Sequence, residues 1–136
     1  MTQNEVKTLL SVAVISFRRY KAKSDEADTF RQQLAIKPLS NGGGGTSSKI
    51  NSTELGYIQL AALEEKQRTL YTEWLQARER VVKAIDMCPL EKERQVLIYR
   101  YLNNCRYEDI AEALGYSIDN IFKLHKKAIR YLSNVL

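Results

Sequence analysis

Apolar residues recur at alternating three- and four-residue steps through the first part of the chain. Between residues 4 and 36 the row consists of Val6, Leu9, Ala13, Ser16, Tyr20, Lys23, Ala27, Phe30 and Leu34. This spacing keeps one seam on one side of a helix, as in coiled coils. Ser16 and Lys23 weaken the middle of the seam, and Pro38 ends the helix. The pattern predicts one long amphipathic helix over residues 4–36.

A second row with the same spacing lies between residues 60 and 84. It consists of Leu60, Leu63, Gln67, Leu70, Trp74, Ala77, Val81 and Ala84. Ser52 or Thr53 is the expected N-cap of this helix, and Pro89 prevents its continuation. The glycine- and serine-rich residues 40–53 before it predict a loop. Two long amphipathic helices joined by a loop are expected to form an antiparallel hairpin.

Three shorter segments follow, and the last two form a corner. Residues 90–103 predict a helix, with Leu90, Leu97, Ile98 and Tyr101 on the face that packs on the corner. Gly115 ends the next helix where a left-handed cap is needed, and Ser117 caps the last helix. The inner stripe of that helix consists of Ile121, Leu124, Ala128, Ile129 and Leu132. Two helices joined by a short turn with a glycine are typical of a helix-turn-helix.

The predicted fold class is therefore all-α: a long antiparallel helical hairpin followed by a three-helix helix-turn-helix domain. We place the hairpin, with its Gly/Ser-rich loop near 40–53, at residues 1–88 and assign it to oligomerisation or partner binding. Residues 89–136 form the predicted DNA-binding domain.

The charge of the chain also indicates DNA as the ligand of this helical corner. The formal net charge is +5 and the pI is about 9.2, which suits a polyanionic partner. The last helix carries Lys123, Lys126, Lys127 and Arg130 against one acid, Asp119. Because the second helix of such a corner enters the major groove, double-stranded DNA is the expected ligand.

The position of each side chain predicts its role on DNA. Ile118, Asp119, Asn120 and Lys123 lie in the first turns after the Ser117 cap and are expected to reach base edges. Lys126, Lys127 and Arg130 are expected to meet phosphates, and Arg106 and Tyr107 are placed for backbone contact. Phe122 lies either on the groove face or against the hairpin.

Other classes of function lack their residues. Two cysteines and one histidine make no common zinc site, and four consecutive glycines without the Gly-Lys-Ser/Thr spacing make no P-loop. We therefore expect no enzyme, no catalytic residues, no metal and no cofactor. No apolar run approaches the roughly 18 residues of a membrane span, and no signal peptide is evident. The expected location is the cytoplasm, with no membrane partner.

The run LEKERQVLIYRYLNNCRYEDIAEALGYSIDNIFKLHKKAIRYL resembles region four of bacterial sigma factors. The segments RQVLIYRYLNN and YEDIAEALGYS carry the resemblance, together with the alanine and leucine of KKAIRYL. In length and layout the chain resembles phage-encoded regulators of the RinA/ArpU late-gene activator type. The resemblance implies promoter or regulatory DNA as ligand, with RNA polymerase as a second candidate partner, in the cytoplasm of a bacterial host cell. His125 departs from the family's usual apolar residue, and both a buried histidine and a phosphate contact are open.

The function expected is a sequence-specific DNA-binding transcriptional regulator of phage or prophage late-gene type. The alternatives are a phage DNA-packaging protein of small-terminase type and a sigma-like module that binds RNA polymerase. Leu10, Val14, Ile15, Tyr57 and Ile58 lie off the two seams. Since exposed apolar rows usually mark a partner surface, we also expect a homodimer through the N-terminal helices.

Overall fold

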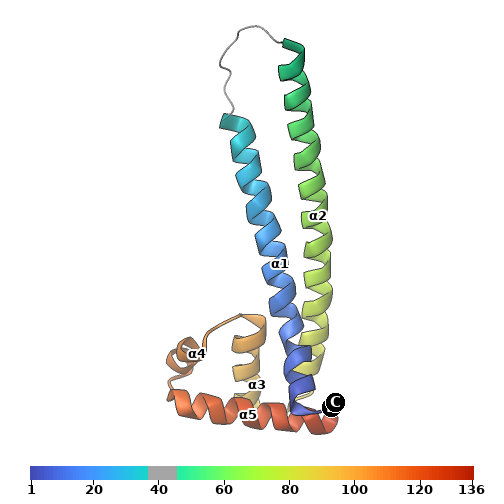
Figure 1. The fold of residues 1–136 in the computed structure, drawn as a ribbon. Helices are drawn as coiled ribbons and strands as arrows, with labels where there is room; N and C mark the ends of the chain where they lie inside the picture. Colours follow the sequence, from blue (N-terminus) through green and yellow to red (C-terminus); the bar gives the residue numbers. More distant parts are fainter. Residues whose placement is uncertain (37–45) are drawn as a thin grey trace. The chain divides into compact units, whose positions relative to one another are not determined.

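The computed structural model describes residues 1–36 and 46–136 (Figure 1). The elements in chain order are α1 (Gln3–Ile36), α2 (Thr46–Asp86), α3 (Glu91–Leu97), the π-helical turn η1 (Ile98–Leu102), α4 (Tyr107–Leu114) and α5 (Ile118–Val135). Every regular element among these described residues is helical, which confirms the predicted all-α class.

The chain divides into two compact units. Unit 1 joins residues 1–16 to residues 74–136, and unit 2 is residues 17–73. The start of α1 and the end of α2 therefore belong to the same unit as α3, α4 and α5. The functional boundary between residues 88 and 89 stays a prediction.

A capping box begins α1. The Thr2 backbone N–H donates to Glu5 Oε1 at 3.1 Å, and the Glu5 N–H donates to Thr2 Oγ1 at 3.1 Å. Two backbone donors of the first turn are satisfied reciprocally in this way. The hydrogen bond from the Thr2 backbone holds the pKa of the Glu5 carboxyl below its ordinary value. Our sequence prediction missed this cap, although the Thr-x-x-Glu spacing is its signature.

In unit 2, α1 and α2 run antiparallel, because contacts advance along one helix as they retreat along the other. Tyr20 and Tyr71 have ring centroids 5.3 Å apart, and Arg31 Nη2 lies 2.9 Å from Glu64 Oε2. Near the far end, a Cβ built on Gly56 would lie 2.7 Å from Leu34 Cδ2. Gly56 thus lets Leu34 pack directly on the α2 backbone.

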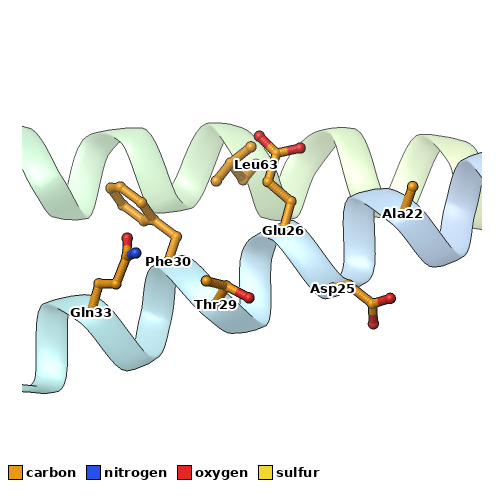
Figure 2. A pocket seen from close by; sticks show the side chains of 7 residues that line it. All are labelled: Ala22, Asp25, Glu26, Thr29, Phe30, Gln33 and Leu63. Atoms are coloured by element: carbon orange, nitrogen blue, oxygen red, sulfur yellow. The ribbon is translucent and has the colours of Figure 1, made fainter.

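A shallow hollow of about 380 Å³ lies beside this helix pair (Figure 2). Its lining comes mainly from α1, with Leu63 contributed by α2: Ala22, Asp25, Glu26, Thr29, Phe30, Gln33 and Leu63. Four of these seven side chains are polar, and the hollow is open to solvent at the surface of unit 2.

The second helix begins earlier than the sequence predicts. We expected an N-cap at Ser52 or Thr53, but α2 begins at Thr46. Residues 46–53 contain no glycine or proline, which would interrupt a helix. The serines and threonines there have low helix propensity, and they extend the long helix that follows. Residues 40–45 of the expected loop and Pro38 lie outside the described residues.

The largest core of unit 1 draws on both ends of the sequence. Buried residues of α1 and α2 meet buried residues of α3, η1 and α5: Val6, Leu10, Ala13, Val81, Ala84, Ile85, Cys88, Leu97, Tyr101, Ala128, Ile129 and Leu132. Leu10 is fully buried here, which corrects the expectation that it lies on a free surface. The two-seam pattern missed Leu10 because it considers only contacts between α1 and α2, whereas α3, η1 and α5 also pack against them.

A second core lies within the helix-turn-helix. Val96 of α3, Ile110 and Ala111 of α4, and Ile121 of α5 are its buried members. Leu97 and Tyr101 pack on the second helix of the corner, as expected, because their core includes Ala128, Ile129 and Leu132 of α5. Val96, which the sequence prediction did not single out, packs with the buried residues of α4.

Candidate nucleic-acid interface

The corner between α4 and α5 has the geometry predicted for it. Gly115 has φ 73°, in the left-handed region that glycine adopts most easily. Tyr116 N–H donates to the Ala111 carbonyl at 3.0 Å, which closes the end of α4. Ser117 then caps α5, because its Oγ accepts a hydrogen bond from the Asn120 N–H at 3.2 Å. Both caps are local signals, and both predictions are confirmed.

The α5 helix has one buried side and one charged side. The buried residues are Ile121, His125, Ala128, Ile129 and Leu132. The exposed residues between Ile118 and Arg130 are Asp119, Phe122, Lys123, Lys126, Lys127 and Arg130. The four cations therefore lie on the side of α5 that faces away from the core.

The first turn of α5 offers a mixed surface. Ser117 and Asp119 are exposed, whereas Ile118 and Asn120 are half-buried. The Asn120 backbone N–H is occupied by the cap, which leaves its side-chain amide for another partner. With Lys123 one turn further on, this surface carries the donors and acceptors that base edges require.

Lys127 differs from the other cations of α5. Its Nζ lies 3.5 Å from Oε1 of Glu93, an acid of α3 that is largely buried. A buried carboxylate needs a compensating partner, and Lys127 supplies one across the α3–α5 contact. Lys127 thus has a structural partner in addition to its expected phosphate contact. The sequence prediction missed Glu93, because an acid on a short helix gives no signal of burial.

Arg106 and Tyr107 lie in different surroundings at the start of α4. Arg106 is exposed, and its Nε lies 3.2 Å from Asp109 Oδ2, a hydrogen bond that raises the pKa of the guanidinium. Tyr107 is half-buried beneath Arg100, whose guanidinium carbon lies 4.1 Å from the ring centroid. Arg100 also donates from Nη1 to the Cys105 carbonyl at 3.1 Å. Arg100 was not among the predicted residues.

His125 is a buried residue of the core and not a surface contact. Its Nε2 lies 2.8 Å from the Tyr101 hydroxyl of η1. Burial, with Lys7 and Arg100 nearby, lowers the pKa of His125 to about 4. Burial likewise raises the pKa of Tyr101 to about 12. Of the two possibilities left open for His125, the structure supports the buried, hydrogen-bonded histidine.

Phe122 lies on the flank of α5 beside α4. Its side chain is 46% exposed, and its ring meets the Tyr107 ring edge to face at 5.0 Å. The partner of Phe122 is therefore α4, and its outer part remains exposed next to Lys123 and Lys126. This position corrects the alternative in which Phe122 packs on the hairpin.

Two further properties concern other kinds of site. Within residues 1–36 and 46–136, no three His, Cys, Asp or Glu side chains are grouped so that they could hold a metal ion. None of the helices described is long and apolar enough to span a bilayer.

A capped corner that presents a basic helix is the arrangement found in DNA-binding helix-turn-helix modules. Residues 90–132 match the family model described as Sigma-70, region 4, a family of DNA-binding helix-turn-helix domains. The match begins at α3 and ends within α5, so it covers less than half of the chain. No curated protein and no solved structure matches the chain.

Proposed function

We propose that the protein is a sequence-specific DNA-binding transcriptional regulator that reads the major groove with α5. The observation that carries this proposal is the division of α5 into a buried stripe and an opposite face with Lys123, Lys126 and Arg130. That face belongs to the segment that matches sigma-70 region 4. A neutral or acidic face at the same place would have argued for a protein-binding module instead.

Roles within the surface follow from position along the helix. Ile118, Asp119, Asn120 and Lys123, in the first turns, read base edges. Lys126 and Arg130 lie further along and meet phosphates, which set register and affinity. Asn pairs bidentately with adenine, so Asn120 is the residue with the clearest expected base preference.

Selection of bound DNA from a random pool, at two stated salt concentrations, tests this function. We expect one recurring sequence and a specific affinity that exceeds non-specific binding at both salt concentrations. Asn120→Ala should relax the preference at one base pair, at a cost of about 1–3 kcal/mol on the best site. A pool that remains random after repeated rounds would overturn the proposal of sequence-specific binding.

The biological setting we propose is phage or prophage late-gene regulation of the RinA/ArpU type. The arrangement that supports it is a helical first half followed by a region-four-like module. RNA polymerase is the proposed second partner, because domains of sigma-70 region 4 bind both DNA and the polymerase. Retention of purified RNA polymerase by the immobilised protein without DNA would support this partner, and no retention would contradict it.

We further propose that the N-terminal helices join two copies of the chain. Ile15, Tyr57 and Ile58 are 46%, 58% and 65% exposed, and a second copy that packs on α1 and α2 would cover such large apolar side chains. A two-fold dimer would let two α5 helices meet successive major grooves. Sedimentation equilibrium decides the matter: a protein still monomeric well above the DNA-binding concentration would exclude the dimer.

A further inference from the structure

Phe122 combines properties that do not fit a residue with a purely structural role. It is a large apolar side chain, 46% exposed, on a helix flank next to Lys123 and Lys126. Ile118 lies four residues earlier, so the two side chains are neighbours on one side of α5. Together they form an apolar strip that begins in the base-reading turn and borders the cations.

The ring of Phe122 is also held in place by its neighbours. Tyr107 meets it edge to face with centroids 5.0 Å apart and planes at 64°. Tyr107 is fixed in turn by the Arg100 guanidinium at 4.1 Å and by His125, whose ring centroid lies 5.6 Å away at 85°. A side chain ordered before binding loses little entropy when it meets a ligand. The ring of Phe122, held by Tyr107 and through it by Arg100, is therefore a preorganised apolar contact.

The charge around the strip indicates what covers it. The cations of α5 attract a polyanion, and Phe122 lies among them. On the base edges of the major groove, the apolar group available to such a side chain is the C5-methyl of thymine. We propose that Phe122, next to Ile118, reads a thymine methyl group, and that Tyr107 acts as the positioning residue for Phe122. This inference rests on the proposed function of α5 in the major groove.

Replacement of single thymines by uracil in the selected site tests the proposal. Uracil keeps every hydrogen-bonding group and removes only the methyl. We expect the full chain to lose about fourfold in affinity at one or two thymines, the effect of one buried methyl group each. Phe122→Ala should bind the thymine and uracil sites equally well at the position that Phe122 reads. Lys126→Ala should bind both sites more weakly and keep the same ratio between them.

Positioning by Tyr107 has its own comparison. Tyr107→Phe keeps the ring that contacts Phe122, so the ratio between thymine and uracil should survive. Tyr107→Leu removes the ring face, so the ratio should fall towards one although Phe122 is present. Thermal melts of each variant, followed by circular dichroism, give the folded fraction, by which the affinities are corrected.

The outcomes separate this inference from the function on which it rests. Selection of no sequence at all would overturn both. A selected site in which every uracil is tolerated, or a Phe122→Ala variant as sensitive to uracil as the parent chain, would overturn the methyl contact alone. Equal ratios for Tyr107→Leu and Tyr107→Phe would overturn the positioning role.

Discussion

At the scale of single residues, the cations of α5 do not share one role. Lys126 is exposed and belongs to the outer face of the helix, whereas Lys127 lies 3.5 Å from the buried acid Glu93. Their positions in the sequence are adjacent, so the pattern alone assigned both to phosphates. The structure separates them, because only a fold shows which exposed lysine has a buried acid within reach.

Lys126→Ala should weaken binding to all DNA sequences alike and lower the salt slope by about 0.9 for the lost phosphate contact. The free energy of unfolding should stay within about 0.5 kcal/mol, because the side chain is exposed. Lys127→Ala is the matched comparison for stability, and it should cost about 1 kcal/mol by removing the partner of Glu93. Titrations at several salt concentrations and urea melts measure both. A changed base preference in Lys126→Ala would contradict its assignment.

His125 should titrate near pH 4 in the folded protein, well below its ordinary pKa of 6.5. The unfolded chain binds a proton between these values and the folded chain does not, so the free energy of unfolding falls as pH drops from 6.5 to 4. The loss approaches about 3 kcal/mol. His125 is the single histidine of the chain, so NMR of its ring reads the titration directly. His125→Gln should lose less stability over this range, and a ring that titrates near 6.5 would contradict its burial.

At the scale of elements, local signals predicted well and non-local ones did not. Gly115 and Ser117 were predictable because a left-handed cap and an N-cap depend on neighbours within a few residues. The π-helical turn Ile98–Leu102 was not, since we expected an uninterrupted helix over 90–103. Its widened turn is accompanied by the contact of Tyr101 with His125, a residue of a different helix. The candidate base-contacting residues of α5 could be named from the sequence alone. The stacking of Arg100 on Tyr107 could not, because it joins residues of different elements.

Gly115→Ala tests the corner itself. A Cβ at Gly115 meets no atom within 4 Å, so the cost comes only from the backbone at φ 73°. We expect a loss of about 1–2 kcal/mol in the free energy of unfolding. Gly115→Asn should lose less, because asparagine tolerates the left-handed region better. Chemical denaturation of the three proteins measures this order, and an alanine variant as stable as the parent would contradict it.

At the scale of the whole molecule, unit 1 takes its core from both ends of the sequence. Val6 and Leu10 of α1 share that core with Ala128, Ile129 and Leu132 of α5. Periodicity could not show this, because it assigns residues to a face of a helix without naming the helix opposite. Residues 89–136 alone would expose the α5 side of this core to water.

Leu10→Ala should therefore destabilise unit 1 by about 2–5 kcal/mol, as expected for a fully buried leucine. Gln3→Ala, at an exposed position on the same helix, is the control and should stay within about 0.5 kcal/mol. Urea denaturation measures the change in the free energy of unfolding for each variant. Hydrogen exchange of the α5 amides shows whether α5 loses protection with it. Equal effects of the two substitutions would show that Leu10 does not belong to the core that supports α5.

The shared core of unit 1 also determines when this unit can form during synthesis. Val6 leaves the ribosome early, and its partner residues on α5 leave it only after almost all of the described sequence has been translated. Contacts between such distant parts of a chain form slowly, because the entropy of closing a long loop is lost before the contacts stabilise the fold. The apolar start of α1 therefore remains without these partners until α5 has been synthesised. The DNA binding that we propose for α5 should therefore begin only after α5 has left the ribosome and packed on α1.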